Sequence, residues 1–127
     1  MIKGLGCKYV IIGHSENRVN GDDNVLINKK IKVSLDSKLK ILFCIGENFK
    51  EKKNKKTKIV IKSQINGALK NIKNIKNIIF AYEPVWSIGT GIIPKQRELK
   101  NNILFIKQLL KKKFKLKNPK VLYGGSV

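Results

Sequence analysis

The chain alternates short apolar runs with longer amphipathic segments. Four runs rich in Ile, Val, Phe and Tyr are close to continuously apolar, which is typical of strands buried on both faces of a parallel sheet. They cover residues 8–13, 40–46, 77–82 and 120–125. The pattern therefore predicts four strands, each short enough to lie inside an α/β protein.

Apolar positions at helical spacing fill the segments between these runs, over residues 26–35, 59–72 and 99–110. The order is strand, helix, strand, and so on, ending on a strand. Strands joined through a helix pair in parallel by right-handed crossovers, so the sequence predicts one α/β domain over residues 1–127. The lysine-rich run 50–58 is expected to be a solvated loop that leads into the second helix.

Polar residues follow each apolar run: GHSEN, GENFK, EPVWSIGTG and GGSV. Parallel strands bring these segments to one rim of the sheet, where α/β folds bind ligands. His14 and Glu83 end strands one and three, so at about 4.8 Å per strand their backbones lie roughly 10 Å apart. By themselves these residues are a weak signal, because a lone histidine is more often a structural residue than a catalyst.

Net charge and cysteine content bear on whether the protein binds nucleic acid and on the compartment in which it works. The net charge is +20, yet only Arg18 and Arg97 among the 28 basic residues are arginines, whereas a reader of nucleic acid favours the bidentate Arg side chain. Cys7 and Cys44 lack metal-ligand spacing and are expected to be free thiols in a reducing compartment. No apolar run reaches the length of a membrane span, and no secretory signal pattern opens the chain. A cytoplasmic protein without a metal is therefore expected.

The motifs IIGHSEN, CIGE, AYEPVWSIGTG and LYGGSV, in this order, resemble the triosephosphate isomerase family over about residues 4–127. The resemblance implies part of a (β/α)8 barrel, with strands four to seven of an eight-stranded fold of about 250 residues. It implies an isomerase of glycolysis and gluconeogenesis that interconverts dihydroxyacetone phosphate and D-glyceraldehyde 3-phosphate through an enediolate, without a cofactor. It also implies a cytoplasmic homodimer for the full-length protein, with no nucleic-acid or membrane partner.

The resemblance also implies roles for single residues. Glu83 matches the general base of the family and His14 the neutral imidazole that polarises the substrate carbonyl, both established properties of the family. Glu16 matches an acid of the family motif near the site. The backbone N–H groups of Gly89 and Ser126 match those that hold the substrate phosphate.

A mobile lid is implied after the third strand. Trp86 resembles its hinge, and the indole N–H is expected to reach Glu47. Asn17 replaces the first of two arginines of the family, which leaves Asp22 as the candidate partner of Arg18. The implied lid residues are Pro84, Val85, Trp86, Ser87, Ile88, Gly89, Thr90 and Gly91.

Two other functions stay open beside the isomerase. One is a shortened, non-catalytic remnant that binds phosphate or a partner, and the other is a basic nucleic-acid-binding module. The 127 residues alone are expected to be inactive, because the family's substrate-binding lysine lies on a strand that this chain does not show. An open set of strands should also expose its outer edges and the inner-face residues Ile11, Ile12, Leu42 and Cys44.

The lysine distribution generates a test of the nucleic-acid alternative. Since lysines are spread along the helical segments, duplex DNA should bind weakly, with a steep salt dependence and no sequence preference. A titration against two unrelated duplexes at several salt concentrations measures this. Tight, sequence-selective binding at physiological salt would instead support a nucleic-acid-binding module.

Overall fold

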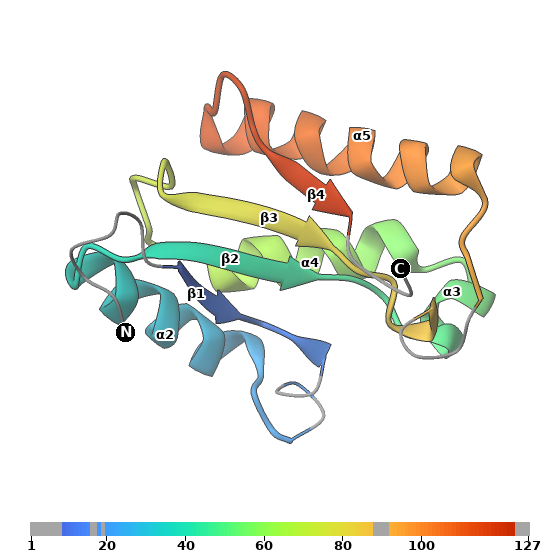
Figure 1. Cartoon of the computed structure of the whole chain (residues 1–127), viewed down its shortest axis with the longest axis horizontal. Helices are drawn as coiled ribbons and strands as arrows, with labels where there is room; N and C mark the ends of the chain where they lie inside the picture. The colour runs from blue at the N-terminus through green and yellow to red at the C-terminus, as the bar shows by residue number, and fades with distance from the viewer. Residues whose placement is uncertain (1–8, 16–17, 19, 88–91, 124–127) are drawn as a thin grey trace.

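The computed structural model describes residues 9–15, 18, 20–87 and 92–123. Its four strands form a single sheet in the order β1-β2-β3-β4, and every neighbouring pair is parallel (Figure 1). Strand order thus follows chain order, which confirms the predicted parallel α/β arrangement. The strands are β1 (Tyr9–Ile12), β2 (Lys40–Ile45), β3 (Ile78–Tyr82) and β4 (Val121–Tyr123).

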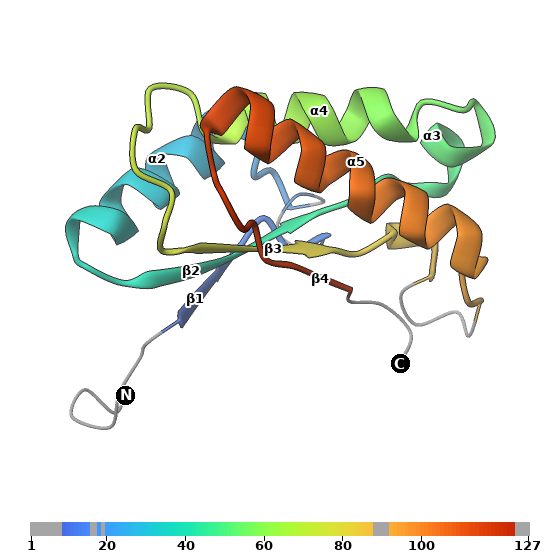
Figure 2. The ribbon, with the colours of Figure 1, turned by 90° about the horizontal axis from the view of Figure 1, so that it is seen from above.

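Three long helices lie on one face of this sheet, as Figure 2 shows. They occupy the three predicted segments, although the second ends at Ala68 because Asn71, at a φ of +63°, turns the chain back toward β3. The helical elements are α2 (Asn24–Asp36), α3 (Phe49–Lys53), α4 (Thr57–Ala68), the 3-10 turn η2 (Val85–Ser87) and α5 (Gln96–Phe114).

The short helix α3 corrects the prediction of a loop over residues 50–58. Asn48 caps it by accepting a hydrogen bond of 2.8 Å from the N–H of Glu51, and the Glu51 carboxylate accepts one of 2.8 Å from the N–H of Asn48. This reciprocal capping box satisfies two amide groups that would otherwise lack partners. The lysines of the last turn also interact favourably with the negative end of the helix dipole.

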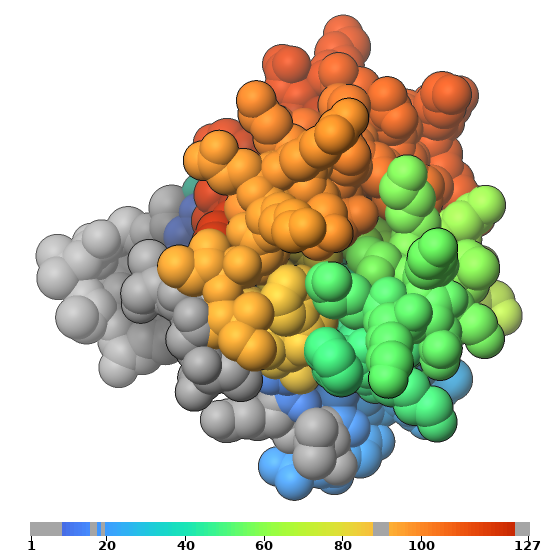
Figure 3. Space-filling view, turned by 90° about the vertical axis from the view of Figure 1, so that its right-hand side faces the viewer, coloured from blue at the N-terminus to red at the C-terminus, as the bar shows by residue number. Residues whose placement is uncertain are grey.

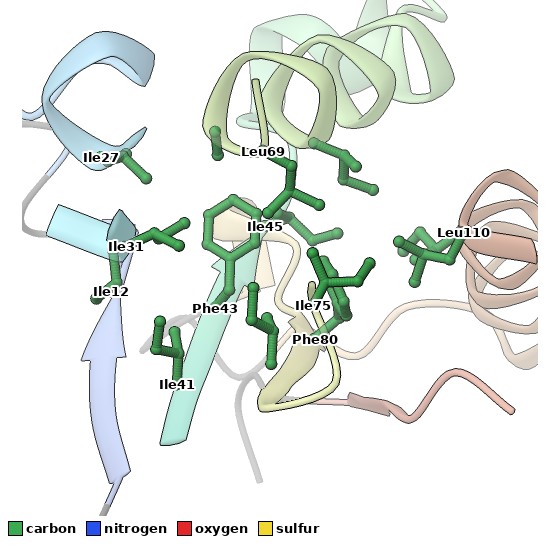
Figure 4. Packing of buried hydrophobic residues seen from close by; sticks show 14 of the residues in the cluster. Ile12, Ile27, Ile31, Ile41, Phe43, Ile45, Leu69, Ile75, Phe80 and Leu110 are labelled. Carbon is green, nitrogen blue, oxygen red and sulfur yellow. The ribbon is translucent and has the colours of Figure 1, made fainter. Parts of the chain in front are cut away.

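The hydrophobic core fills the space between the sheet and the three long helices. The rings of Phe43 and Phe80, which are partners in the β2–β3 register, meet edge to face with centroids 5.9 Å apart. Figure 4 shows Ile31 of α2 beside Ile12, and Leu110 of α5 directed toward Phe80. All five side chains are nearly inaccessible to solvent. Burial of each such side chain stabilises the fold by about 1.5–3 kcal/mol, so this layer holds the strands in register.

The opposite face of the sheet carries apolar side chains without helices over them. Ile11 and Leu122 are 59% and 52% exposed, whereas Ile12 is 4% exposed and belongs to the helix-side core. The inner-face prediction was therefore wrong for Ile12, because successive residues of a strand point to opposite faces. Leu42 is half-buried, and Cys44 is buried near Glu83 and Arg18 instead of exposed. Within the described residues, no strand pairs with the outer edges of β1 and β4.

Two neighbouring substitutions test this assignment of faces. Ile11→Lys should change the free energy of unfolding by no more than about 0.5 kcal/mol, because its side chain is exposed, and should reduce self-association. Ile12→Lys should lower that free energy by about 3–5 kcal/mol, because it buries an unpaired charge. Urea denaturation and sedimentation velocity measure the two effects. Equal destabilisation by both substitutions would contradict the assignment.

Candidate active site

His14 and Glu83 meet at the carboxyl end of the sheet. They follow β1 and β3, with β2 between them, and His14 Nε2 lies 3.9 Å from Glu83 Oε2. The imidazole side chain is 34% exposed, whereas the carboxylate side chain is only 11% exposed. A ligand can therefore reach the imidazole ring, and the carboxylate lies beneath it in a largely water-free position.

The surroundings of Glu83 make its carboxylate more basic than it is in water. Burial raises the pKa of Glu83, while His14, a hydrogen bond from the Ser15 N–H and Arg18 act in the opposite direction without cancelling it. A group that abstracts a proton from carbon works best when its pKa is shifted toward the working pH. The described geometry thus supplies a base suited to that step.

The backbone of Glu83 is fixed by β2. Its N–H donates a hydrogen bond of 2.8 Å to the Ile45 carbonyl, which continues the parallel ladder one step past β3. Gly46 lies directly against it, since a Cβ atom added to Gly46 would stand 1.9 Å from the Glu83 carbonyl oxygen. Only glycine fits this approach without moving the main chain that carries the carboxylate.

The segment around His14 turns sharply away from the strand. Gly13 has a φ of +82°, and a Cβ atom there would lie 2.7 Å from the Cys44 carbonyl oxygen. The Arg18 N–H donates a 3.1 Å hydrogen bond to the His14 carbonyl, which ties these two residues together.

Arg18 ties the segment that follows β1 to the last residues of β2, through Gly13 and Cys44. Its guanidinium donates to the carbonyls of Gly13 and Cys44, at 2.9 and 3.3 Å, and to Asn24 Oδ1 at 3.3 Å. It also lies 6.0 Å from the centre of the Phe43 ring. Burial lowers the pKa of Arg18, and nearby Cys44 and Glu83 partly oppose that shift.

The predicted partner of Arg18 is engaged elsewhere. Asp22 forms an ion pair with Lys30, and the guanidinium uses main-chain carbonyls and an amide instead. Asp22 still acts on Arg18 through its charge, which raises the pKa of the guanidinium, while a cluster of main-chain carbonyls at the strand end accepts its hydrogen bonds. Sequence spacing alone gives no sign of such a cluster.

A buried carboxylate holds the 3-10 turn after β3, where the resemblance implies a hinge. Glu47, 1% exposed, accepts hydrogen bonds from the Trp86 indole at 2.7 Å and the Tyr82 hydroxyl at 2.8 Å. The first of these confirms the predicted contact. Asn102 of α5 donates to the Tyr82 oxygen at 3.0 Å, and Lys52 lies 4.8 Å above the Trp86 ring. Burial and the neighbouring Glu47 raise the pKa of Tyr82, so its hydroxyl stays a donor.

Tyr82 and Asn102 were missed in the sequence. Tyr82 ends an apolar strand and Asn102 lies in a lysine- and asparagine-rich helix, so neither stands out by type or spacing. A carboxylate that follows a buried strand does require donors, and that requirement was the available signal.

The first half of the implied lid is ordered by the ends of β2 and β3. The Val85 N–H donates to the Glu47 carbonyl at 2.9 Å, and both the N–H and the hydroxyl of Ser87 donate to the Pro84 carbonyl. The remaining site predictions lie outside the described residues, and their roles stay predictions. These residues are Glu16, Ile88, Gly89, Thr90, Gly91 and Ser126.

A cavity of about 300 Å³ lies behind this hinge, between α3 and the start of α5. Figure 3 shows this side of the molecule. Lys52, Trp86 and Asn102 line the cavity, but His14 and Glu83 do not, so it is separate from the paired imidazole and carboxylate. Among the described residues, no His, Cys, Asp or Glu cluster could hold a metal ion. None of the described helices is long and apolar enough to cross a membrane.

The sheet is parallel, its helices lie on one face, and the His14 imidazole and Glu83 carboxylate follow alternate strands. This is the architecture of (β/α)-barrel proteins. The family model for triosephosphate isomerase matches residues 1–127. The triosephosphate isomerase of Thermodesulfovibrio yellowstonii is 43% identical over 132 residues, which cover 100% of this chain and 53% of that protein. Those of Mycoplasmoides gallisepticum and Yarrowia lipolytica are 42% and 41% identical, over 99% of this chain and 52% of each relative.

The chain belongs to the triosephosphate isomerase family. It spans about half the length of the curated relatives that it matches. The four strands accordingly form part of the family's barrel.

The burial of Glu83 predicts a measurable penalty to stability. Because burial raises the pKa of the folded carboxyl above 4.5, the folded state holds more protons between the two values, and the free energy of unfolding falls as the pH rises through that interval. Glu83→Gln removes the buried charge and keeps the shape. We expect the variant to exceed the parent in stability at about pH 7 and to approach it below the unfolded pKa.

Equilibrium denaturation across this pH range measures the difference. Glu98→Gln serves as the control, because the Glu98 side chain is 48% exposed and pairs with Lys52 instead of His14. A Glu83→Gln variant that is less stable than the parent at neutral pH would show that the ion pair with His14 outweighs burial.

Proposed function

We propose that the chain carries the catalytic base and electrophile of a triosephosphate isomerase, which interconverts dihydroxyacetone phosphate and D-glyceraldehyde 3-phosphate. The observation that carries the proposal is the 3.9 Å approach of the His14 imidazole and the Glu83 carboxylate. Both lie in the part of the chain that the family model matches. The names of the relatives supply the substrate class.

Glu83 would remove a proton from the carbon next to the substrate carbonyl and return it to the adjacent carbon. Between these two transfers the substrate is an enediolate, and the carboxyl group holds the proton. His14 would donate a hydrogen bond to the oxygen on which negative charge develops. The raised pKa of Glu83 supports the first role, and the solvent-accessible ring of His14 supports the second.

The substrate phosphate would be held by the backbone N–H groups of Gly89 and Ser126, with Glu16 near the site. We propose further that residues 1–127 form part of one barrel domain and that the 127 residues alone lack isomerase activity. The chain spans about half of each relative, and a barrel site draws on residues from several strands. For the whole protein we propose a cytoplasmic homodimer.

A hybrid enzyme tests the assignment. In this hybrid, the chain replaces the matching segment of the Thermodesulfovibrio yellowstonii relative, which supplies the remaining parts of the barrel. Glu83→Gln in the hybrid should lower kcat by roughly 10²–10⁴-fold, because the amide cannot accept the proton. Affinity for inorganic phosphate, as a competitive ligand, should stay unchanged.

Glu98→Gln is again the control and should leave turnover intact. A Glu83→Gln hybrid with kcat within about threefold of its parent would refute the role of the base. A parent hybrid that folds and binds phosphate, but has no turnover, would favour the non-catalytic remnant instead.

A further inference from the structure

The side-chain amide of Gln64 forms hydrogen bonds with both main-chain polar groups of Gly46, the residue that follows β2. The N–H of Gly46 donates to Gln64 Oε1 at 2.9 Å, and Gln64 Nε2 donates to the Gly46 carbonyl at 3.1 Å. Gly46 is buried, and Gln64 lies in α4, on the helix-covered side of the sheet. The amide thus pairs with Gly46 as a neighbouring strand would, with one donor and one acceptor.

Among the described residues, the neighbouring strands give Gly46 no main-chain hydrogen bond at this place. The residues on either side of it, Ile45 and Glu47, accept hydrogen bonds from Glu83 and Val85 of the β3 segment. The N–H and the carbonyl of Gly46 both form hydrogen bonds with Gln64 instead. Without the amide, a buried N–H and a buried carbonyl would both need new partners, and the peptide would rotate or admit water to find them.

Movement of Gly46 would reach Glu83 directly. The two backbones are so close that no side chain fits at position 46, where a Cβ atom would stand 1.9 Å from the Glu83 carbonyl oxygen. Glu83 follows β3 by one residue, so its carboxylate projects from the same short stretch of main chain. The position of the carboxylate relative to His14 therefore depends on the orientation of the Gly46 peptide.

We propose that Gln64 is a positioning residue for the proton-transferring carboxylate: by fixing both polar groups of Gly46, it fixes the main chain from which Glu83 projects. Gln64 contacts neither the substrate nor the reacting atoms in this arrangement. The inference rests on the proposed isomerase function for its catalytic consequence. The restraint on Glu83 itself is inferred from the hydrogen bonds between Gln64 and Gly46 and does not depend on that function.

Asn28 provides a matched control, because its side chain bonds to the main chain at the other end of α4. Asn28 of α2 donates to the carbonyls of Ala68 and Lys70, at 2.6 and 2.9 Å, where α4 ends. Like Gln64, it is a half-buried amide whose side chain makes two hydrogen bonds to main-chain groups. It differs in lying away from Gly46 and Glu83, so its loss reports the effect of a missing amide on stability alone.

The test compares Gln64→Met and Asn28→Leu in the hybrid enzyme, since both substitutions keep approximate size and remove the amide. Gln64→Met should lower kcat by about 10–100-fold and leave KM within about twofold, because a displaced base slows proton transfer without weakening phosphate binding. Asn28→Leu should leave kcat and KM near the parent values. Gln64→Glu, which keeps the acceptor for the Gly46 N–H, should recover part of kcat.

Amide hydrogen exchange adds a readout that needs no turnover. The Glu83 N–H should exchange faster in Gln64→Met than in the parent, and at an unchanged rate in Asn28→Leu. If the parent hybrid folds and binds phosphate but is inactive, the proposed function fails, and exchange alone still decides whether Gln64 restrains Glu83. Equal protection of Glu83 in parent and Gln64→Met, or equal loss of kcat in Gln64→Met and Asn28→Leu, would overturn the inference.

Discussion

A parallel sheet can bring two side chains together at its rim only if the strands that carry them stay in register up to their last residues. In this protein that condition rests on β2, which lies between the strands that lead to His14 and Glu83. Pairing continues past β3, through the hydrogen bond from Glu83 to Ile45. The rings of Phe43 and Phe80 hold the same register from the helix side, two steps below the rim. The separation of imidazole and carboxylate is thus a property of the sheet and its core.

Burying the Glu83 carboxylate at this rim costs stability, and the same burial makes it a better base, because burial disfavours the ionised form. The thiol of Cys44 experiences a similar environment, where burial and the nearby Glu83 raise its pKa to about 12. Arg18 lowers the pKa of both groups, and His14 lowers the pKa of Glu83 more strongly. The site therefore combines a charge that destabilises the fold with a guanidinium that limits the loss.

The sequence predicted the strands and long helices well, because continuous apolar runs and helical spacing are local signals. It failed where the signal was ambiguous or distant. Ile11 and Ile12 are equally apolar, so no alternation shows which one faces the helices. The capping residue Asn48 stands two residues before a lysine-rich run that resembled a loop. The partnership of Gln64 with Gly46 joins residues 18 positions apart, and a polar residue in an amphipathic helix gives no hint of it.

Strand order that equals chain order has a consequence for how the protein is made. Each strand pairs with the strand before it, and each long helix contacts at least one of the strands that flank it in the sequence. Every strand pairing therefore closes a single β/α unit, the shortest connection that parallel strands allow. During synthesis, a chain emerging from the ribosome can add one β/α unit at a time to an edge that is already formed, in the direction of translation. His14 is then in place before Glu83 has left the ribosome, and the imidazole–carboxylate pair assembles only when β3 docks on β2.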